Sequence, residues 1–349
     1  MMNAVAAPSA TPGSAAPARV ARRGASARWG LWLALVAIGI FVPKVLTSPF
    51  YLSLVINGMI LGVAAVGIGF LMHQCGLVMF GVAAFIGLPS YLVGLASAQL
   101  GLGLNAAVLF ALVASTLFAV VVGALVVRAR PLPFAMLTLA LAQMLKTVAT
   151  LQVMRPYTGG DDGLAMTFNG TFLTLTQVDL AKPGVFWPVA WVALCGVLTL
   201  AWCAGRSRFG QVLRATQANE ERMRFSGFDT YVPRLIAFTL ASFVISISGV
   251  LIALNSAFAS PELLDFATGG HALVAMLVGG GTTVGGPLVG ALLYTWGQDA
   301  FGATGHLELL TGIAVVAVIA AFPQGVTGFL LQLWRRERKP DRGGSDAAR

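Results

Sequence analysis

The stretch YLSLVINGMILGVAAVGIGFLM, Tyr51–Met72, contains no charged residue and is long enough to cross a bilayer as a helix. A spanning helix needs about twenty consecutive apolar residues. The pattern recurs along the 349-residue chain, which is 57% hydrophobic, only 10% charged and has a mean hydropathy of +0.84. A soluble domain of this length cannot bury so much apolar surface, and a membrane barrel would show short alternating segments. The sequence therefore predicts an all-α, multi-span membrane protein.

Nine apolar segments can be read along the chain. They are Gly30–Leu46, Tyr51–Met72, Leu77–Ala98, Leu104–Val127, Leu132–Met154, Val185–Ala204, Leu235–Ala257, His271–Phe301 and Leu307–Leu331. Pro89 interrupts the third segment. The run VGGGTTVGGP cuts the eighth, which is too long for one crossing and short for two. We expect it to form two short crossings or a re-entrant pair joined at the glycines.

Basic residues between the apolar segments predict the orientation. With a cytoplasmic N-terminus, 18 of the 22 basic residues fall on the cytoplasmic side: four in the first tail, two between the fourth and fifth segments, six from Arg206 to Arg234 and six in the last tail. This is the bias that the positive-inside rule describes. Both termini are then cytoplasmic, which requires an even number of crossings and gives about ten transmembrane elements, including the broken pair.

The chain divides into three parts on this basis. Residues 1–29 form a disordered basic cytoplasmic tail, residues 30–331 a transmembrane domain with a cytoplasmic loop at 206–234, and residues 332–349 a second basic cytoplasmic tail. The first tail also allows a transit peptide or a twin-arginine export signal, but several spans follow it, which favours the cytoplasmic tail. The net charge of +9 does not predict nucleic-acid binding, because the basic residues occupy topological positions. Cys75, Cys195 and Cys203 show no metal or redox spacing.

The loop SRFGQVLRATQANEERMRFSGFDTYVPR, Ser207–Arg234, concentrates charge in a chain that has little. Phe209, Val212 and Leu213 follow a helical spacing, and charged or polar residues cover the other side. We expect one or two short amphipathic helices that end near Gly227. Such helices either lie on the lipid headgroups or dock a cytoplasmic partner. The spacing alone does not separate these two readings.

Four stretches, in order, resemble LivM-type permeases, the membrane subunits of ABC importers for branched-chain amino acids and related solutes. They are GLVMFGVAAFIGLPSYL (Gly76–Leu92), TGGDDGL (Thr158–Leu164), SRFGQVLRATQANEERMRFSGF (Ser207–Phe228) and SPELLDFATGGHALVAMLVGGGTTVGGPLVGALL (Ser260–Leu293). The second resembles the family's external loop signature and the third its coupling loop. The resemblance covers roughly Tyr51 to Gly328.

The resemblance implies a permease subunit of the cell inner membrane that has no catalytic site, metal or cofactor of its own. It implies three partners besides the bilayer: cytoplasmic ATP-binding subunits, a second related permease subunit and an external solute-binding protein. The loop would sit in a groove of an ATPase. The coupling residues would be Arg208, Phe209, Arg214, Glu220 and Arg222, with Gly210 and Gly227 setting the backbone shape.

The chain also departs from the family's pattern. Leu77, Met79 and Val82 replace polar residues in the third span, and Pro89-Ser90 replaces Gly-Ala. The loop has Thr216-Gln217 where the family has Ile and Arg. The third-span departure leaves the identity of the solute undecided, and a less polar pathway lining would suit an apolar or aromatic solute.

Two glycine-containing motifs have more than one reading. In TGGDDGL, Asp161 and Asp162 suggest a metal or acid–base pair, but no third ligand lies nearby, so a solvated turn or a contact with the solute-binding protein is favoured. This external loop comprises Thr158, Gly159, Gly160, Asp161, Asp162 and Gly163. The late glycine run lacks the lysine of a phosphate-binding loop. It marks either close helix packing or a break that lines the pathway, as do the glycines of the third span. The candidate positions are Gly76, Gly81, Gly87, Gly279, Gly280, Gly281, Gly285 and Gly286.

The charged residues within the apolar segments help to choose between the competing functions. Lys146 lies inside the fifth apolar segment and either reaches the outer interface or contacts the solute. No acidic residue lies in the middle of a span, which disfavours a stand-alone secondary transporter or channel, the main alternative. A purely structural membrane subunit is a third class, and an intramembrane protease would need a histidine deep in a span. An ABC importer permease is the leading hypothesis.

Overall fold

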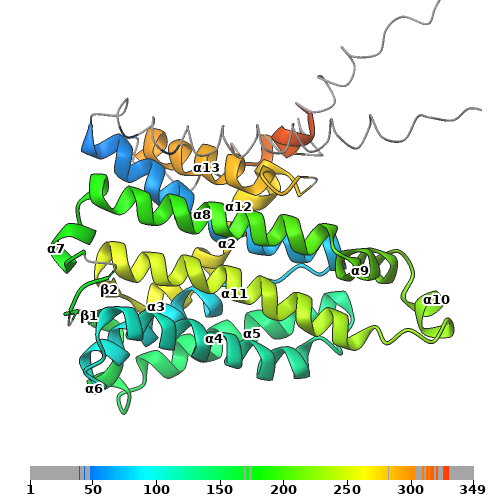
Figure 1. Ribbon diagram of the computed structural model, residues 1–349, viewed down its shortest axis with the longest axis horizontal. Helices are drawn as coiled ribbons and strands as arrows, with labels where there is room; N and C mark the ends of the chain where they lie inside the picture. The colour runs from blue at the N-terminus through cyan, green and yellow to red at the C-terminus, as the bar shows by residue number, and fades with distance from the viewer. Residues whose placement is uncertain are drawn as a thin grey trace, which may run out of the picture. The chain divides into compact units, whose positions relative to one another are not determined.

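The computed structural model describes residues 48–302, except 169, 173, 174 and 282, together with residues 39, 43, 309, 312, 313, 315–317, 320 and 325–329. The two basic tails, and most of the first and last apolar segments, lie outside the described residues. The described part is built almost entirely of helices, which confirms the all-α class (Figure 1).

Within the described residues, five helices are long and apolar enough to cross a membrane. They are α2 (Pro49–Cys75), α4 (Leu104–Val126), α5 (Pro131–Thr150), α8 (Pro183–Arg206) and α11 (Tyr231–Ser256). Each matches an apolar segment expected from the sequence to within a few residues. Three of them begin with a proline, whose fixed φ suits a first helical position and whose missing N–H would have had no intrahelical partner there.

Three shorter apolar helices also lie in the part of the chain that the structure describes. They are α3 (Val82–Ala98), α12 (Phe266–Gly279) and α13 (Gly286–Gly302). The expected break at the late glycine run is confirmed, because α12 ends where the run begins and α13 starts at Gly286. The expected interruption at Pro89 is wrong, since α3 continues through it. The adjacent Ser90 hydroxyl donates to the carbonyls of Ile86 (3.0 Å) and Gly249 (2.6 Å), which ties this part of the helix to α11.

Helix α2 is the most enclosed span, with 78% of its apolar window buried against 28–33% for α4, α5 and α8. It packs against α8, α11, α12 and α13. The approach to α13 is close: a Cβ on Gly58 would stand 2.9 Å from Leu292, and one on Gly62 2.7 Å from Leu288. Glycines in membrane helices allow this closeness. Helix α2 is therefore the centre around which the other helices are arranged.

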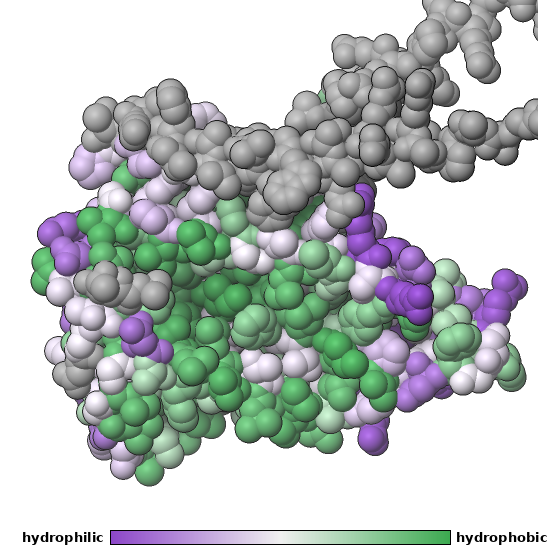
Figure 2. Space-filling view, viewed as in Figure 1, coloured by the Kyte–Doolittle hydropathy of each residue, from purple (hydrophilic) through white to green (hydrophobic). Residues whose placement is uncertain are grey.

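The short elements gather at the two ends of the spans (Figure 1). One end, called the β1–β2 end, carries an antiparallel pair in which Leu164 lies opposite Ala259. Its elements are α6 (Arg155–Thr158), η1 (Gly160–Asp162), β1 (Leu164–Ala165), α7 (Gln177–Leu180), β2 (Phe258–Ala259) and η2 (Pro261–Leu264). The other end carries α9 (Arg208–Ala218) and α10 (Glu220–Phe225). Figure 2 shows apolar residues over α8 and α11 and polar residues gathered around α9 and α10.

Candidate functional site

The charged loop folds into the two helices α9 and α10, as the sequence predicts. Ser207 caps α9, its hydroxyl accepting from the N–H of Gly210 at 3.3 Å. Asn219 ends α9 and caps α10, its side chain accepting from the N–H of Arg222 at 2.9 Å. Such side-chain caps satisfy backbone donors that have no partner within the helix. The expected end near Gly227 is also confirmed, since α10 ends at Phe225 and Gly227 has φ = 81°.

Helix α9 is fixed to the spanning helices through Arg214. The Nη1 atom of Arg214 donates to Oε1 of Gln74, at 3.0 Å, and to the carbonyl oxygen of Gly205, at 2.8 Å. Gln74 lies in the last turn of α2 and is only 5% exposed. One guanidinium thus joins α9 to the ends of both α2 and α8. The sequence offers Arg214 as a contact for an ATPase, whereas here it binds the chain's own helices.

Gly210 explains how α9 comes so close to α8. A Cβ at this position would overlap the carbonyl oxygen of Gly205 and lie 2.7 Å from that of Ala204. Gly205 is constrained in turn, because its Cβ would stand 2.8 Å from Nε2 of Gln74. The prediction that Gly210 sets the backbone shape therefore has a direct structural cause. Gly227 has open space around it, so its positive φ is its reason for being glycine.

Helix α10 is fixed to α11 through Glu220. Its Oε2 atom lies 2.7 Å from Nη2 of Arg234 and its Oε1 atom 2.9 Å from Nη2 of Arg224. The hydroxyl of Thr230 also donates to Oε1, at 3.3 Å. The side chain of Arg234 is 13% exposed, so this ion pair is screened less than one on the surface. Glu220, like Arg214, thus binds residues of the chain's own spanning helices.

The outer side of α9 and α10 remains available. Arg208 and Arg222 are exposed and form no ion pair with any residue that the structure describes. Phe209 is half-buried, and Phe225 is 90% exposed. The first three are among the predicted ATPase contacts. Phe225 is not, although an aromatic residue on an amphipathic helix is a signal for a docking surface. Gln74 and Arg234 were also missed, because neither has a partner nearby in the sequence.

The glycines proposed for a pathway fall into two groups. A Cβ would overlap the carbonyl of Thr138 at Gly81, and the carbonyl of Gly286 at Gly279. Close packing accounts for these positions, and equally for Gly87, whose Cβ would meet Leu264 at 2.5 Å. A Cβ on Gly286 would likewise overlap the Gly280 carbonyl, so Gly286 belongs to this first group. In the second group, Gly76 and Gly280 have positive φ, and Gly281 and Gly285 have open space around them.

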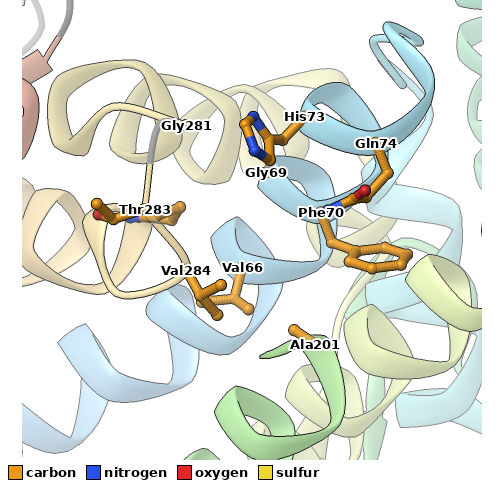
Figure 3. A pocket seen from close by; sticks show the side chains of 10 residues that line it. Val66, Gly69, Phe70, His73, Gln74, Ala201, Gly281, Thr283 and Val284 are labelled. Atoms are coloured by element: carbon orange, nitrogen blue, oxygen red, sulfur yellow. The ribbon is translucent and has the colours of Figure 1, made fainter. Parts of the chain in front are cut away.

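A cavity of about 30 Å³ lies beside the α12–α13 turn (Figure 3). Gly281, Thr283 and Val284 of the turn line it, together with side chains from α2 and α8. Gln74, the partner of Arg214, is one of them. A cavity of this volume has room for water. The end of α2 therefore contacts α9 through Gln74 and also lines this cavity beside the glycine turn.

The external-loop motif forms a tight turn at the β1–β2 end. The Thr158 hydroxyl is buried and donates to the Ala149 carbonyl at 2.6 Å. Gly159, Gly160 and Gly163 have φ of 77°, 63° and 76°, which L side chains rarely adopt. The two acids are exposed: Asp162 pairs with Arg155 at 3.0 Å, and Asp161 has no ion pair with a described residue. No cluster of three potential metal ligands occurs among the described residues.

Lys146 forms an ion pair at the same end. Its Nζ atom lies 2.9 Å from Oδ2 of Asp265, and Gln143 donates to Oδ1 at 3.4 Å. Asp265 also caps α12, accepting from the N–H of Phe266 at 2.7 Å. The hydrogen bond from Lys146 lowers the pKa of this carboxyl below its ordinary value. Neither reading of Lys146 from the sequence includes this partner, which lies in a distant segment.

Comparisons with known proteins show the family of the chain. Residues 50–323 match the family described as "Branched-chain amino acid transport system / permease component". The chain is 28% identical over 248 residues to the "Autoinducer 2 import system permease protein LsrC" of Yersinia pseudotuberculosis serotype IB, and equally to that of Yersinia pestis Pestoides F. These alignments cover 69% of this chain and 64% of each relative, so the chain spans less than two thirds of the length of the relatives. No solved structure matches.

Proposed function

The chain belongs to the branched-chain amino acid transport system permease family, a family of ABC transporter permeases, and from this premise we propose that it is the spanning subunit of an ATP-driven importer. It is a polytopic, all-α membrane protein. In the proposal it has about ten transmembrane elements and cytoplasmic termini and resides in the cell inner membrane. ATP hydrolysis takes place on a partner chain.

One observation carries the proposal: α9 and α10 lie outside the spans, and each is fixed to the spanning helices by one charged side chain. Arg214 joins α9 to α2 and α8, and Glu220 joins α10 to α11. A loop with no partner would be free to move, whereas these contacts hold the loop to the spans while Arg208, Arg222 and Phe225 remain exposed. A stiff lever with an exposed docking face is what transmission of an ATPase movement requires.

The structure suggests the path of that movement. A displacement of α9 acts through Arg214 on Gln74, at the end of the most enclosed span. Gln74 also lines the cavity beside the α12–α13 turn, so the displacement reaches the glycine-rich break. Tightly packed elements transmit such shifts as discrete rearrangements, because interiors are too dense to deform smoothly. We place Arg208, Arg222 and Phe225 against the ATPase, and the residues that bind the spanning helices, Arg214 and Gln74, along the path.

The solute is proposed to be small: a branched-chain or other amino acid, or a related amide or organic acid. The LivM-type stretches support this class, while the curated relatives are named for autoinducer 2 import. Amino acids and autoinducer 2 should therefore be tested together as candidate solutes. A second related permease subunit and an external solute-binding protein complete the proposed assembly, with the loop Thr158–Gly163 as the candidate contact for the binding protein.

Co-purification tests the proposal. The tagged full chain is expressed in its native host, solubilised gently, and its partners are identified and counted. An ATPase and a second permease at fixed stoichiometry, with ATP-dependent solute uptake in liposomes, are expected. A single species that moves solute without ATP would refute the importer and favour a stand-alone carrier or channel.

Variants of the docking face sharpen the same experiment. Arg208→Ala and Arg222→Ala should reduce ATPase recovery, because these side chains are exposed and have no acidic partner within the described chain. Gln211→Ala is the matched control on α9, since Gln211 is equally exposed. Equal ATPase recovery in all three variants would remove this face from the interaction.

A further inference from the structure

Three arginines surround a cavity where α10 meets the spanning helices. The cavity has a volume of about 270 Å³ and lies between the end of α4, α10 and the start of α11. Arg128, Arg224 and Arg234 line it, together with Glu220 and Tyr231. The site contains three positive charges and one negative charge, and therefore has an excess of positive charge.

The arginines are held in place by internal contacts. Glu220 uses one oxygen for Arg224 and the other for Arg234. The guanidinium of Arg128 lies over the ring of Tyr231, 5.2 Å from its centroid, and the Tyr231 hydroxyl donates to the Ala124 carbonyl at 2.9 Å. Each guanidinium has five N–H donors, so the single carboxylate of Glu220 cannot accept from all the donors of three arginines. The donors left over suit a planar or tetrahedral anion such as a phosphate.

The cavity lies at the border of the apolar surface. The same ends of α4 and α11 carry large exposed apolar side chains, with Leu125 74%, Val232 45% and Ile236 49% exposed. Figure 2 shows polar residues gathered at the end of the spans that carries α10. A ligand with an anionic head and apolar chains meets both surfaces at once. Basic pockets between spanning helices on the cytoplasmic side are known to take such headgroups.

We propose that this cavity binds the phosphate of an anionic phospholipid, whose acyl chains lie along α4 and α11. The inference rests on the chain spanning a membrane with the α10 end at the cytoplasmic surface, as the charge distribution predicts, and is independent of the importer role. The bound phosphate would neutralise the excess charge around Glu220 and so hold α10 against α11. The lipid would thus act on the same ion pairs that fix the loop.

Native mass spectrometry of the full chain in detergent tests this site. The probes are phosphatidylglycerol and phosphatidylcholine in equal amounts, and the wild type should retain phosphatidylglycerol preferentially. Each arginine near an anionic surface contributes about fivefold in affinity, so Arg128→Gln should weaken retention about fivefold and the double variant with Arg224→Gln about 25-fold. Arg130→Gln is the matched control: Arg130 is exposed at the same end but does not line the cavity.

Several results would overturn the proposal. One is equal phosphatidylglycerol retention by the double variant and by Arg130→Gln, with melting temperature and elution volume confirming that both are folded. Another is a double variant that loses a co-purifying ATPase but keeps the lipid, which would assign the arginines to a protein contact. Inorganic phosphate that protects the α10 amides from hydrogen exchange without lipid, as well as the lipid does, would show a soluble anion site instead. Restored lipid retention in Arg128→Lys would support the proposal, because the charge is kept.

Discussion

Replacing Arg214 by alanine should release α9 from the spanning helices. The substitution removes the hydrogen bonds to Oε1 of Gln74 and to the Gly205 carbonyl. It also leaves the Gln74 oxygen buried beside the small cavity without its charged donor. The caps at Ser207 and Asn219 remain, so α9 can still form, but without its anchor to the spanning helices it should unfold locally more often.

The size of the effect follows from these two bonds. A hydrogen bond from a charged group contributes about 1.5–3 kcal/mol, and the lower value applies here because Arg214 is exposed to solvent. Two bonds then contribute about 3 kcal/mol. Since 1.4 kcal/mol corresponds to tenfold, the opening equilibrium of α9 should rise by roughly 100-fold.

Hydrogen exchange of the full chain in lipid nanodiscs measures this opening directly. The amides of Arg208–Ala218 should exchange up to about 100-fold faster in Arg214→Ala, while those of α4 remain unchanged. Arg208→Ala removes the same charge from the same helix but no internal bond, so it should leave this exchange as in the wild type. Equal α9 protection in the two variants would show that Arg214 does not anchor the helix, and the proposed path would lose its first step.

Three further substitutions test the rest of the site. Gly81→Ala should destabilise the chain by about 1–3 kcal/mol or more, because its Cβ overlaps a carbonyl of α5, whereas Gly196→Ala, in open space on α8, should be neutral in a thermal melt. Gly159→Ala should cost about 1–2 kcal/mol for its positive φ alone, and an unchanged melting temperature would contradict the turn geometry. Asp265 has a lowered pKa, so its ion pair with Lys146 stabilises the fold above about pH 4, and this contribution is lost as the pH falls through the folded pKa. Thermal melts from pH 6 to pH 3 should show this loss in the wild type and not in Asp265→Asn.

The sequence predicts the long helices well because a single physical requirement sets them. A spanning helix must be apolar over its length, and Tyr51–Met72 satisfies this without reference to any other segment. The break before Gly286 is predictable for a similar reason, since a cluster of glycines weakens a helix locally. The beginning of α3 at Val82, and not at Leu77, was missed because apolar residues outside a helix look the same as those inside it.

The partners of the charged residues could not be predicted. Spacing shows that Arg214 and Glu220 lie on amphipathic helices, but not which groups they meet. Arg214 pairs with a residue 140 positions away, and Asp265 with one on another span. Polar residues such as Gln74, at the end of an apolar segment, are the useful signal, because a buried amide needs a partner. The pattern thus locates the site but not its internal bonds.

The central place of α2 has a consequence for how the protein is made. Its glycine face at Gly58 and Gly62 is covered by Leu288 and Leu292, about 230 residues later in the chain. A ribosome adding about 5–20 residues per second needs about 10–50 s to reach them. During that time α2 waits in the bilayer with its close-packing face open to lipid or to other nascent spans. Assembly is therefore completed late and from the C-terminal side, and a substitution in α13 should be read first as a biogenesis defect.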